Sequence, residues 1–262
     1  MLRECSKARL SAVLFLLKGP AMCEPFSCVV KSDLSILTGK SIAHHSHSEI
    51  IQDAGLPAEI SMNQYARVEL LPPNHQYASD VEGWELKLDE ERTPEWWEEN
   101  LPEIDARVRD AAQKWQNKLR VLKEWTVEAG EHLIVIGSGA TITQNGGRLH
   151  TFDNSQNTIT QNGGILCTYE NSQNTIIQNN GHLYIRGNSQ NTITVNDGYL
   201  RTYNNSQNTI TQNGADLCTY NNSQNMITQN GGDLHTFDNS QNTITQNGGD
   251  LWTFDNSQNK ML

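Results

Sequence analysis

The sequence predicts an α+β N-terminal domain followed by an all-β parallel β-solenoid of about seven 17-residue coils. A 17-residue unit recurs seven times without a gap over residues 141–259, a total of 119 residues. This period is too short for helical repeats, whose units need roughly 33 to 47 residues. Gly and Asn stand at fixed places between two short β-prone segments of each unit. Because these residues accept positive φ in tight turns, each unit is expected to form one strand–turn–strand–turn coil.

Residues 1–30 are interpreted as a leader or as the product of a wrongly assigned start. A basic beginning and a short apolar run from Leu10 to Leu17 resemble a secretory signal. Lys18 follows that run directly, and translation from Met22 explains the segment equally well. No apolar segment reaches the roughly 20 residues that a spanning helix needs, so we expect no membrane span.

Residues 31–124 predict a small α+β domain that ends in an amphipathic helix. Ser48 can cap a short helix over 48–54, and residues 65–71 and 84–88 read as strands. A second helix is expected to start at Pro94, and a longer one after Pro102. The apolar residues of this longer helix have the spacing of one buried face: Ile104, Val108, Ala111, Trp115, Leu119 and Leu122.

Residues 125–140 are expected to form a leading cap turn, and residues 141–262 the solenoid repeats. Ile stands at the second place and Leu at the ninth place of all seven copies. We expect these two residues to point inward and the flanking Thr residues to point outward. Parallel stacking about 4.8 Å apart would align identical residues, so that amide ladders can form. The fifth place is such a row: Asn145, Asn162, Asn179, Asn196, Asn213, Asn230 and Asn247.

The outward Thr residues form the first candidate ligand face. They stand at the first and third places and would make two ranks about 7 Å apart. The ranks contain Thr141, Thr143, Thr158, Thr160, Thr192, Thr194, Thr209, Thr211, Thr243 and Thr245. This Thr-x-Thr array resembles the ice-binding face of β-solenoid antifreeze proteins. The alternative interpretation is that Thr simply favours strands on a solvated face.

The tenth place varies within an otherwise fixed unit, which predicts a variable surface ladder that faces solvent or a partner. Its residues are His150, Cys167, Tyr184, Arg201, Cys218, His235 and Trp252. The twelfth place is aromatic in six of the seven copies, with Arg186 in the third. These aromatic residues either fill a corner of the core or form an exposed ladder.

The repeats contain little positive charge, with three Arg against eight Asp and Glu, and the whole chain has a net charge of −11. Nucleic acid is therefore not an expected partner, because binding to phosphates draws on Lys and Arg. An atypical capping unit normally ends a solenoid, and only three residues follow the last repeat. The uncapped C-terminal edge predicts protein binding or self-association, and a truncated gene is the alternative.

The five Cys are an odd number without a disulfide framework, which favours reduced thiols and a cytoplasmic or virion-associated location over secretion. Cys167 and Cys218 lie three coils apart, too far to pair. Cys28 lies in a segment with no expected element.

Catalytic and metal motifs are weak. Three His stand within four residues, at His44, His45 and His47, but without the second ligand cluster of a zinc site. We interpret them as a polar loop. The acidic residues over 89–99 are interpreted as solvated charges around a helix start. No nucleophile elbow, P-loop or dinucleotide motif occurs, and Asp at the eighth place of only three coils does not make a calcium β-roll. No cofactor and no enzyme activity are predicted.

Parts of residues 31–123 resemble the N-terminal region of uncharacterised bacterial and prophage-like repeat proteins. The resemblance rests on His47–Ile51, on Arg67–Glu69 followed by Pro72 and Pro73, and on Trp84–Lys87 leading to Thr93–Trp96. It implies a bacterial or phage origin, and it brings no established activity with it. The expected function is a non-catalytic β-solenoid scaffold or interaction module, and the alternative is an ice-binding protein that uses the Thr ranks.

Overall fold

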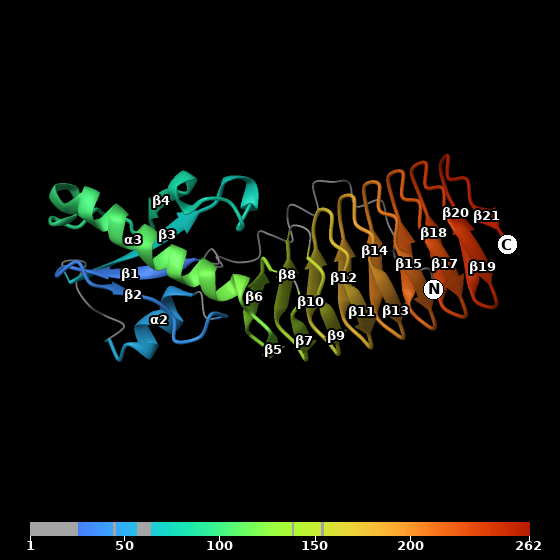
Figure 1. Cartoon of the computed structure of the whole chain (residues 1–262), viewed down its shortest axis with the longest axis horizontal. Helices are drawn as coiled ribbons and strands as arrows, with labels where there is room; N and C mark the ends of the chain where they lie inside the picture. The colour runs from blue at the N-terminus through green and yellow to red at the C-terminus, as the bar shows by residue number, and fades with distance from the viewer. Residues whose placement is uncertain (1–25, 44–45, 57–63, 138, 153–154) are drawn as a thin grey trace. The chain divides into compact units, whose positions relative to one another are not determined.

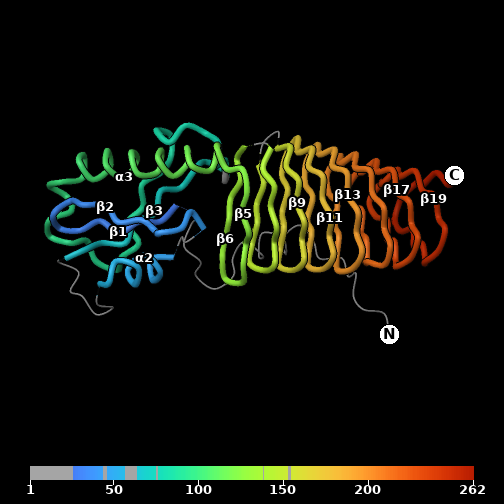
Figure 2. Tube along the Cα trace, turned by 60° about the horizontal axis from the view of Figure 1, so that its bottom comes forward, coloured from blue at the N-terminus to red at the C-terminus, as the bar shows by residue number. Residues whose placement is uncertain are grey.

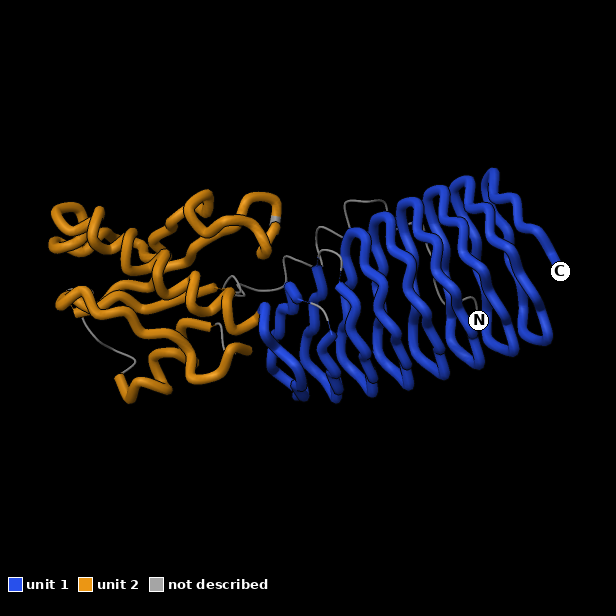
Figure 3. The backbone as a smooth tube through the Cα atoms, viewed as in Figure 1, with its two compact units in different colours: residues 1–5, 120–262 blue, residues 6–119 orange. Residues whose placement is uncertain are grey.

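The predicted fold class is confirmed by a computed structural model that describes residues 26–43, 46–56, 64–137, 139–152 and 155–262. The chain forms two compact units, one that ends at Leu119 and one that runs from Arg120 to Leu262 (Figure 3). The first unit contains an antiparallel sheet and helices, and the second is an all-parallel β-solenoid (Figure 1). The solenoid has about eight coils, because strands that pair with the first repeat begin at Glu124.

The sheet of the first unit has the strand order β2-β1-β3-β4, and all its pairs are antiparallel. Its elements are β1 (Ser27–Lys31), β2 (Ile36–Leu37), β3 (Tyr65–Leu71) and β4 (Glu85–Leu88), with the short 3₁₀ helices η1 (Pro73–His75) and η2 (Val81–Gly83). Cys28, expected in a segment without structure, lies fully buried in β1 opposite Val68. The pairing with β3 gives this short segment its strand.

Helix α2 (His47–Asp53) is capped by Ser46 and not by Ser48. The Ser46 hydroxyl accepts a hydrogen bond from the Glu49 N–H, and the Glu49 carboxylate accepts one from the Ser46 N–H, both at 3.1 Å. This reciprocal capping box requires an acidic or amide residue three places after the cap. Ser48 has Ile51 at that place, so Ser46 makes the better cap.

Helix α3 (Trp97–Arg120) is one continuous helix, so the two helices expected on either side of Pro102 are a wrong prediction. Pro102 removes one backbone hydrogen bond near the start of the helix, and a continuous buried face holds the helix together across it. That face contains Trp97, Ile104, Val108, Ala112, Trp115, Gln116 and Leu119. Ala112 replaces the expected Ala111, and Leu122 lies beyond the helix end. Gln116 is buried because its amide donates to the carbonyl oxygens of Tyr77 and Ser79.

The solenoid consists of two parallel sheets, and every coil contributes one strand to each (Figure 2). The first solenoid sheet contains β5 (Glu124–Val127), β7 (Thr141–Gln144), β9 (Thr158–Gln161), β11 (Thr175–Gln178), β13 (Thr192–Val195), β15 (Thr209–Gln212), β17 (Met226–Gln229), β19 (Thr243–Gln246) and β21 (Lys260–Met261). The second solenoid sheet contains β6 (His132–Val135), β8 (Arg148–Thr151), β10 (Ile165–Thr168), β12 (His182–Ile185), β14 (Tyr199–Thr202), β16 (Asp216–Thr219), β18 (Asp233–Thr236) and β20 (Asp250–Thr253). Equal places of successive repeats pair in register throughout.

The leading segment is a full coil and not an imperfect turn. Trp125 pairs with Ile142, a step of 17 residues, whereas Leu133 pairs with Leu149, a step of 16. The turn between its two strands therefore holds one residue more than in the repeats, and the turn that follows holds one fewer. The two changes cancel, so the leading coil passes into the repeats in register.

Six places of the repeat point into the solenoid. In the first six repeats the expected Ile and Leu rows are buried, as are Gln at the fourth place, Thr at the eleventh, Ser at the fifteenth and Asn at the seventeenth. These four polar rows were not predicted to be inside. Burial of a polar group is costly unless it forms hydrogen bonds, and here the partners come mainly from adjacent coils.

Candidate functional site

The ten predicted Thr residues all lie on β7, β9, β13, β15 and β19, where they alternate with buried Ile. Strand pairing brings Thr141 beside Thr158 and Thr192 beside Thr209, so the two ranks are in register. The first-place Thr is exposed in most coils and the third-place Thr is half-buried. Ile177 and Met226, which are 43 % and 60 % exposed, interrupt the ranks. The Thr face is therefore divided into short blocks.

The fifth-place Asn residues form the predicted ladder beside the Thr ranks. Each Nδ2 donates to the Oδ1 of the Asn one coil earlier, at 2.8–3.0 Å. At the start of the ladder, Asn145 donates to the Glu128 carboxylate of the leading coil at 2.9 Å. A carboxylate can only accept, so all the amides point the same way along the solenoid.

The inward Gln row links each coil to the next. Gln161 Nε2, for example, donates to the carbonyl oxygens of Gly164 in its own coil and His182 in the next, at 3.2 and 3.0 Å. The Oε1 atoms of five of these residues are buried without a hydrogen-bond partner: Gln144, Gln161, Gln178, Gln212 and Gln229. Val195 takes the place of Gln in the fourth repeat. At these five residues the row is structural and offers no accessible group to a ligand, whereas Gln246 of the last repeat is exposed.

The predicted exposure of the tenth-place ladder is wrong at His150, Cys167 and Cys218, which are buried. Twelfth-place rings lie against this row, since the His150 ring centre lies 6.1 Å from that of Phe152 and 5.8 Å from that of Tyr169. Burial also raises the pKa of the Cys167 thiol to about 11. The thiol therefore stays protonated near neutral pH and is a poor nucleophile.

The other tenth-place residues keep some exposure: Tyr184, Arg201 and His235 are half-buried and Trp252 is 46 % exposed. Variation at this place therefore reflects both contact with neighbouring rings and contact with solvent.

The twelfth-place residues form a stacked ladder. Ring centres of successive aromatic residues are 4.7–5.0 Å apart, with interplanar angles of 3–10°. Arg186 continues the ladder, because its guanidinium lies 5.7 Å from the Tyr169 ring centre and 5.8 Å from that of Tyr203. Such cation–π contacts are attractive and orient the guanidinium.

A surface patch of the third and fourth repeats combines these aromatic and cationic groups. It contains His182, Tyr184, Arg186, Tyr199, Arg201 and Tyr203, and we call it the Tyr–Arg patch. The Arg201 guanidinium lies 5.2 Å from the Tyr199 ring centre. Sequence analysis missed the patch because its residues come from three different places of the repeat. Only the stacking of two coils brings them together.

A shallow groove of about 330 Å³ lies along the corner after the second strand. Its lining consists of amide side chains: Asn188, Gln190, Asn205, Gln207, Asn222 and Gln224.

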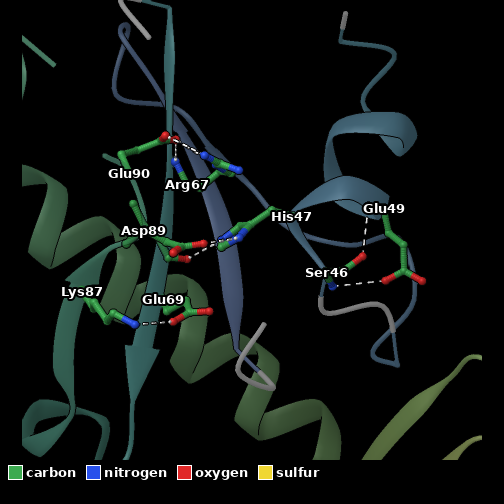
Figure 4. Close-up of polar contacts among 9 residues, drawn as sticks. Ser46, His47, Glu49, Arg67, Glu69, Lys87, Asp89 and Glu90 are labelled. Atoms are coloured by element: carbon green, nitrogen blue, oxygen red, sulfur yellow. Dashed lines mark hydrogen bonds and ion pairs between the residues drawn. The ribbon is translucent and has the colours of Figure 1, made fainter. Parts of the chain in front are cut away.

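The first unit contains a polar cluster around His47 (Figure 4). Of the three His considered for a metal, His44 and His45 lie outside the described residues. His47 is 3 % exposed, its Nδ1 lies 3.3 Å from Asp89 Oδ2 and its Nε2 lies 3.2 Å from the Val68 carbonyl oxygen. Glu69 lies in the same cluster. One possible ligand atom from each of His47, Glu69 and Asp89 lies within 4.8 Å of the other two.

The acidic segment after β4 is only partly a solvated helix start. Glu98 and Glu99 lie in the first turn of α3. Asp89 instead faces His47. Glu90 forms a bidentate ion pair with Arg67, whose Nε and Nη2 donate to the two carboxylate oxygens at 3.0 and 2.9 Å. Burial opposes ionisation of Glu90, but its hydrogen bonds with Arg67 hold the pKa of Glu90 below its usual value.

Comparison with known proteins yields no relative. No family model matches the chain, and no curated protein and no solved structure shows significant similarity to it. The resemblance to prophage-like proteins therefore gains no support. Among the described residues, no helix is both long and apolar enough to cross a membrane.

Proposed function

We propose that this chain is a non-catalytic interaction module, of bacterial or phage type, in which a β-solenoid scaffold displays a binding surface for protein. The observation that carries the proposal is the division of each coil into constant inward rows and a varied tenth-place row, in which Tyr184, Arg201, His235 and Trp252 keep some exposure. The constant rows build the scaffold, and the varied row gathers Tyr, Arg, His and Trp on one side of the second solenoid sheet. Tyr, Trp and Arg are the residue types that dominate binding energy at protein interfaces.

The Tyr–Arg patch is the proposed centre of this surface. The aromatic contacts of Arg186 and Arg201 hold both guanidinium groups in place before a partner binds, which lowers the entropic cost of association. Two of the three Arg of the repeats lie here, in a chain with a net charge of −11. An acidic or aromatic protein segment fits this chemistry.

The test is site-specific photocrosslinking in cells of the source organism. A photoreactive phenylalanine analogue at Tyr184 should give a defined protein adduct that is lost when Arg201→Glu is added. The same analogue at Thr209, on the opposite sheet, is the matched control. Equal adducts at both positions, or none at Tyr184, would refute the Tyr–Arg patch as the binding surface.

We further propose that the last coil of this chain, residues 243–259, contacts a second copy. It leaves apolar groups exposed, with Trp252 at 46 % and Phe254 at 41 %. Light scattering during size exclusion should show a dimer or larger species that Trp252→Glu with Phe254→Glu converts to monomer. A wild-type protein that stays monomeric at all concentrations would contradict self-association.

We also propose that the protein is located in the cytoplasm or in a virion. Among the described residues, the thiols of Cys28 and Cys167 are free and buried, as expected for a reducing compartment.

Ice binding is the second proposed function, and the in-register Thr ranks favour it. Purified protein should then show thermal hysteresis and shaped ice crystals, and Thr209→Lys should abolish both without unfolding the solenoid. The breaks at Ile177 and Met226 shorten the repeating surface, so Ile177→Thr with Met226→Thr should increase the hysteresis. A folded, β-rich protein without any effect on ice would eliminate this function.

A further inference from the structure

The geometry around His47 points to a divalent metal site formed by His47, Glu69 and Asp89 in the N-terminal unit (Figure 4). These residues come from three elements, since His47 begins α2, Glu69 lies in β3 and Asp89 follows β4. A metal there would fasten α2 to the sheet. This inference concerns the first unit and is independent of the proposed binding surface on the solenoid.

The distances suit a shared metal ion. Zinc binds imidazole nitrogen and carboxylate oxygen at about 2.0–2.2 Å, so two of its tetrahedral ligands lie roughly 3.4 Å apart. His47 Nδ1 and Asp89 Oδ2 are 3.3 Å apart, and the Glu69 carboxylate lies within 4.8 Å of both. A small rotation of the Glu69 side chain would complete three ligands. Asp89 is half-exposed, which leaves a path for the ion.

The orientation of His47 also fits a metal ligand. Its Nε2 lies 3.2 Å from the Val68 carbonyl oxygen, which can only accept, so Nε2 carries a hydrogen. In the neutral ring, the lone pair then lies on Nδ1 and faces the carboxylates. Metal-binding His residues commonly donate their other ring N–H to a backbone carbonyl in this way.

The charged side chains around His47 favour the binding of a cation. Lys87 Nζ lies 3.4 Å from Glu69 Oε2. Glu90 and Arg67 neutralise each other nearby. With neutral His47, the three charged side chains Glu69, Asp89 and Lys87 sum to −1. The competing arrangement, without metal, is a protonated His47 that donates to both Asp89 and Val68.

One nitrogen and two oxygen ligands suit divalent ions from Mn²⁺ to Zn²⁺.

The experiment is a titration of the metal-free full-length chain with Zn²⁺ by calorimetry and with Co²⁺ by visible absorption. We expect one equivalent to bind. His47→Gln and Asp89→Asn should each weaken binding by at least about 100-fold, since even partners of metal ligands account for 10–100-fold. Asp110→Asn, which changes an exposed carboxylate of α3, is the control and should leave the affinity unchanged.

Two more variants separate the metal from its alternatives. Lys87→Gln should tighten metal binding about tenfold or more, because it removes a positive charge beside the site, whereas it would only weaken a purely structural ion pair. A double variant that carries His44→Ala and His45→Ala should still bind one equivalent of Zn²⁺. A folded protein that binds no Zn²⁺, or binding that depends on His44 and His45 and not on Asp89, would overturn the proposal.

Discussion

At the scale of single residues, Asn has two different roles in this solenoid, because its place in the repeat determines whether its side chain is exposed or buried. Asn179, at the fifth place, is exposed and bonds Asn162 and Asn196 at 2.8 and 2.9 Å. Asn191, at the seventeenth place, is buried, and its Oδ1 accepts from the Asn174 N–H at 2.7 Å. Water can replace the first pair of bonds but not the second.

This difference predicts unequal costs for one chemical change. Asn191→Ala should lower the free energy of unfolding by about 2–3 kcal/mol, because it leaves a buried backbone N–H without a partner. Asn179→Ala should cost less than about 1 kcal/mol, since exposed hydrogen bonds exchange with water. Urea denaturation followed by circular dichroism gives both values. Equal costs would contradict the burial assigned to the two rows.

His132 of the leading coil predicts a pH dependence of stability. Burial of its ring, with a smaller contribution from the charge of Arg148, lowers the pKa of His132 to about 4. In the unfolded chain a His takes up a proton near pH 6.5. Between these values the unfolded state binds more protons, so the free energy of unfolding falls as pH falls through this window.

His132→Gln should flatten this dependence, because Gln does not titrate. The measurement is the midpoint of urea denaturation of both proteins between pH 4 and pH 7. If the two midpoints fall in parallel with decreasing pH, the neutral burial of His132 is refuted.

At the scale of the elements, each coil is closed by two turns that require unusual backbone angles. The turn after the first strand has Gly at positive φ in most coils, and the corner after the second strand has Asn or Asp pairs at positive φ, such as Asn221 and Asn222 at 50° and 57°. Asn and Gly tolerate these angles. The turns thus explain the Gly at the seventh place of the repeat and the Asn at the fourteenth.

Gly164→Ala should destabilise the solenoid by about 2 kcal/mol, the usual cost of a strained backbone angle. Gly164 has φ of 77°, and an added Cβ would lie 2.6 Å from the carbonyl oxygens of Gly146 and Gly147. Gly83→Ala is the control, because no atom lies within 4 Å of its Cβ position. Thermal unfolding measures both, and a Gly164→Ala protein as stable as Gly83→Ala would disprove the tight turn.

At the scale of the solenoid unit, stability arises from contacts between neighbouring coils, as in other repeat proteins. The Ile row runs unbroken through the repeats, and Ile193 and Ile210 are each 1 % exposed and directly paired. Damage at one coil therefore removes contacts on both of its sides. Outward positions such as Thr209 contribute little to this stack.

Ile193→Asp with Ile210→Asp should unfold much of the solenoid, because two buried carboxylates without partners cost several kcal/mol. Thr209→Lys, one residue from Ile210 but exposed, should leave it folded. Far-UV circular dichroism should show loss of β-structure in the first variant only. Equal tolerance of both changes would contradict the inward Ile row.

The sequence by itself determined the class of fold, the period of the coil and the exposed Asn ladder. Ile and Leu at fixed places and turn residues between them are local signals, and a repeat of constant length leaves one simple way to stack them. The strand over residues 65–71 was equally readable from its own residues.

Only the tertiary structure decided which polar residues are inside and which of them meet. Gln, Ser and Asn look like surface residues in a sequence, and they are buried here because adjacent coils supply their hydrogen bonds. The Tyr–Arg patch needs two stacked coils. His47, Glu69 and Asp89 come together only because β3 pairs with β4 and the first residue of α2 contacts both segments. Such contacts depend on the position of another segment, which no local pattern of residues specifies.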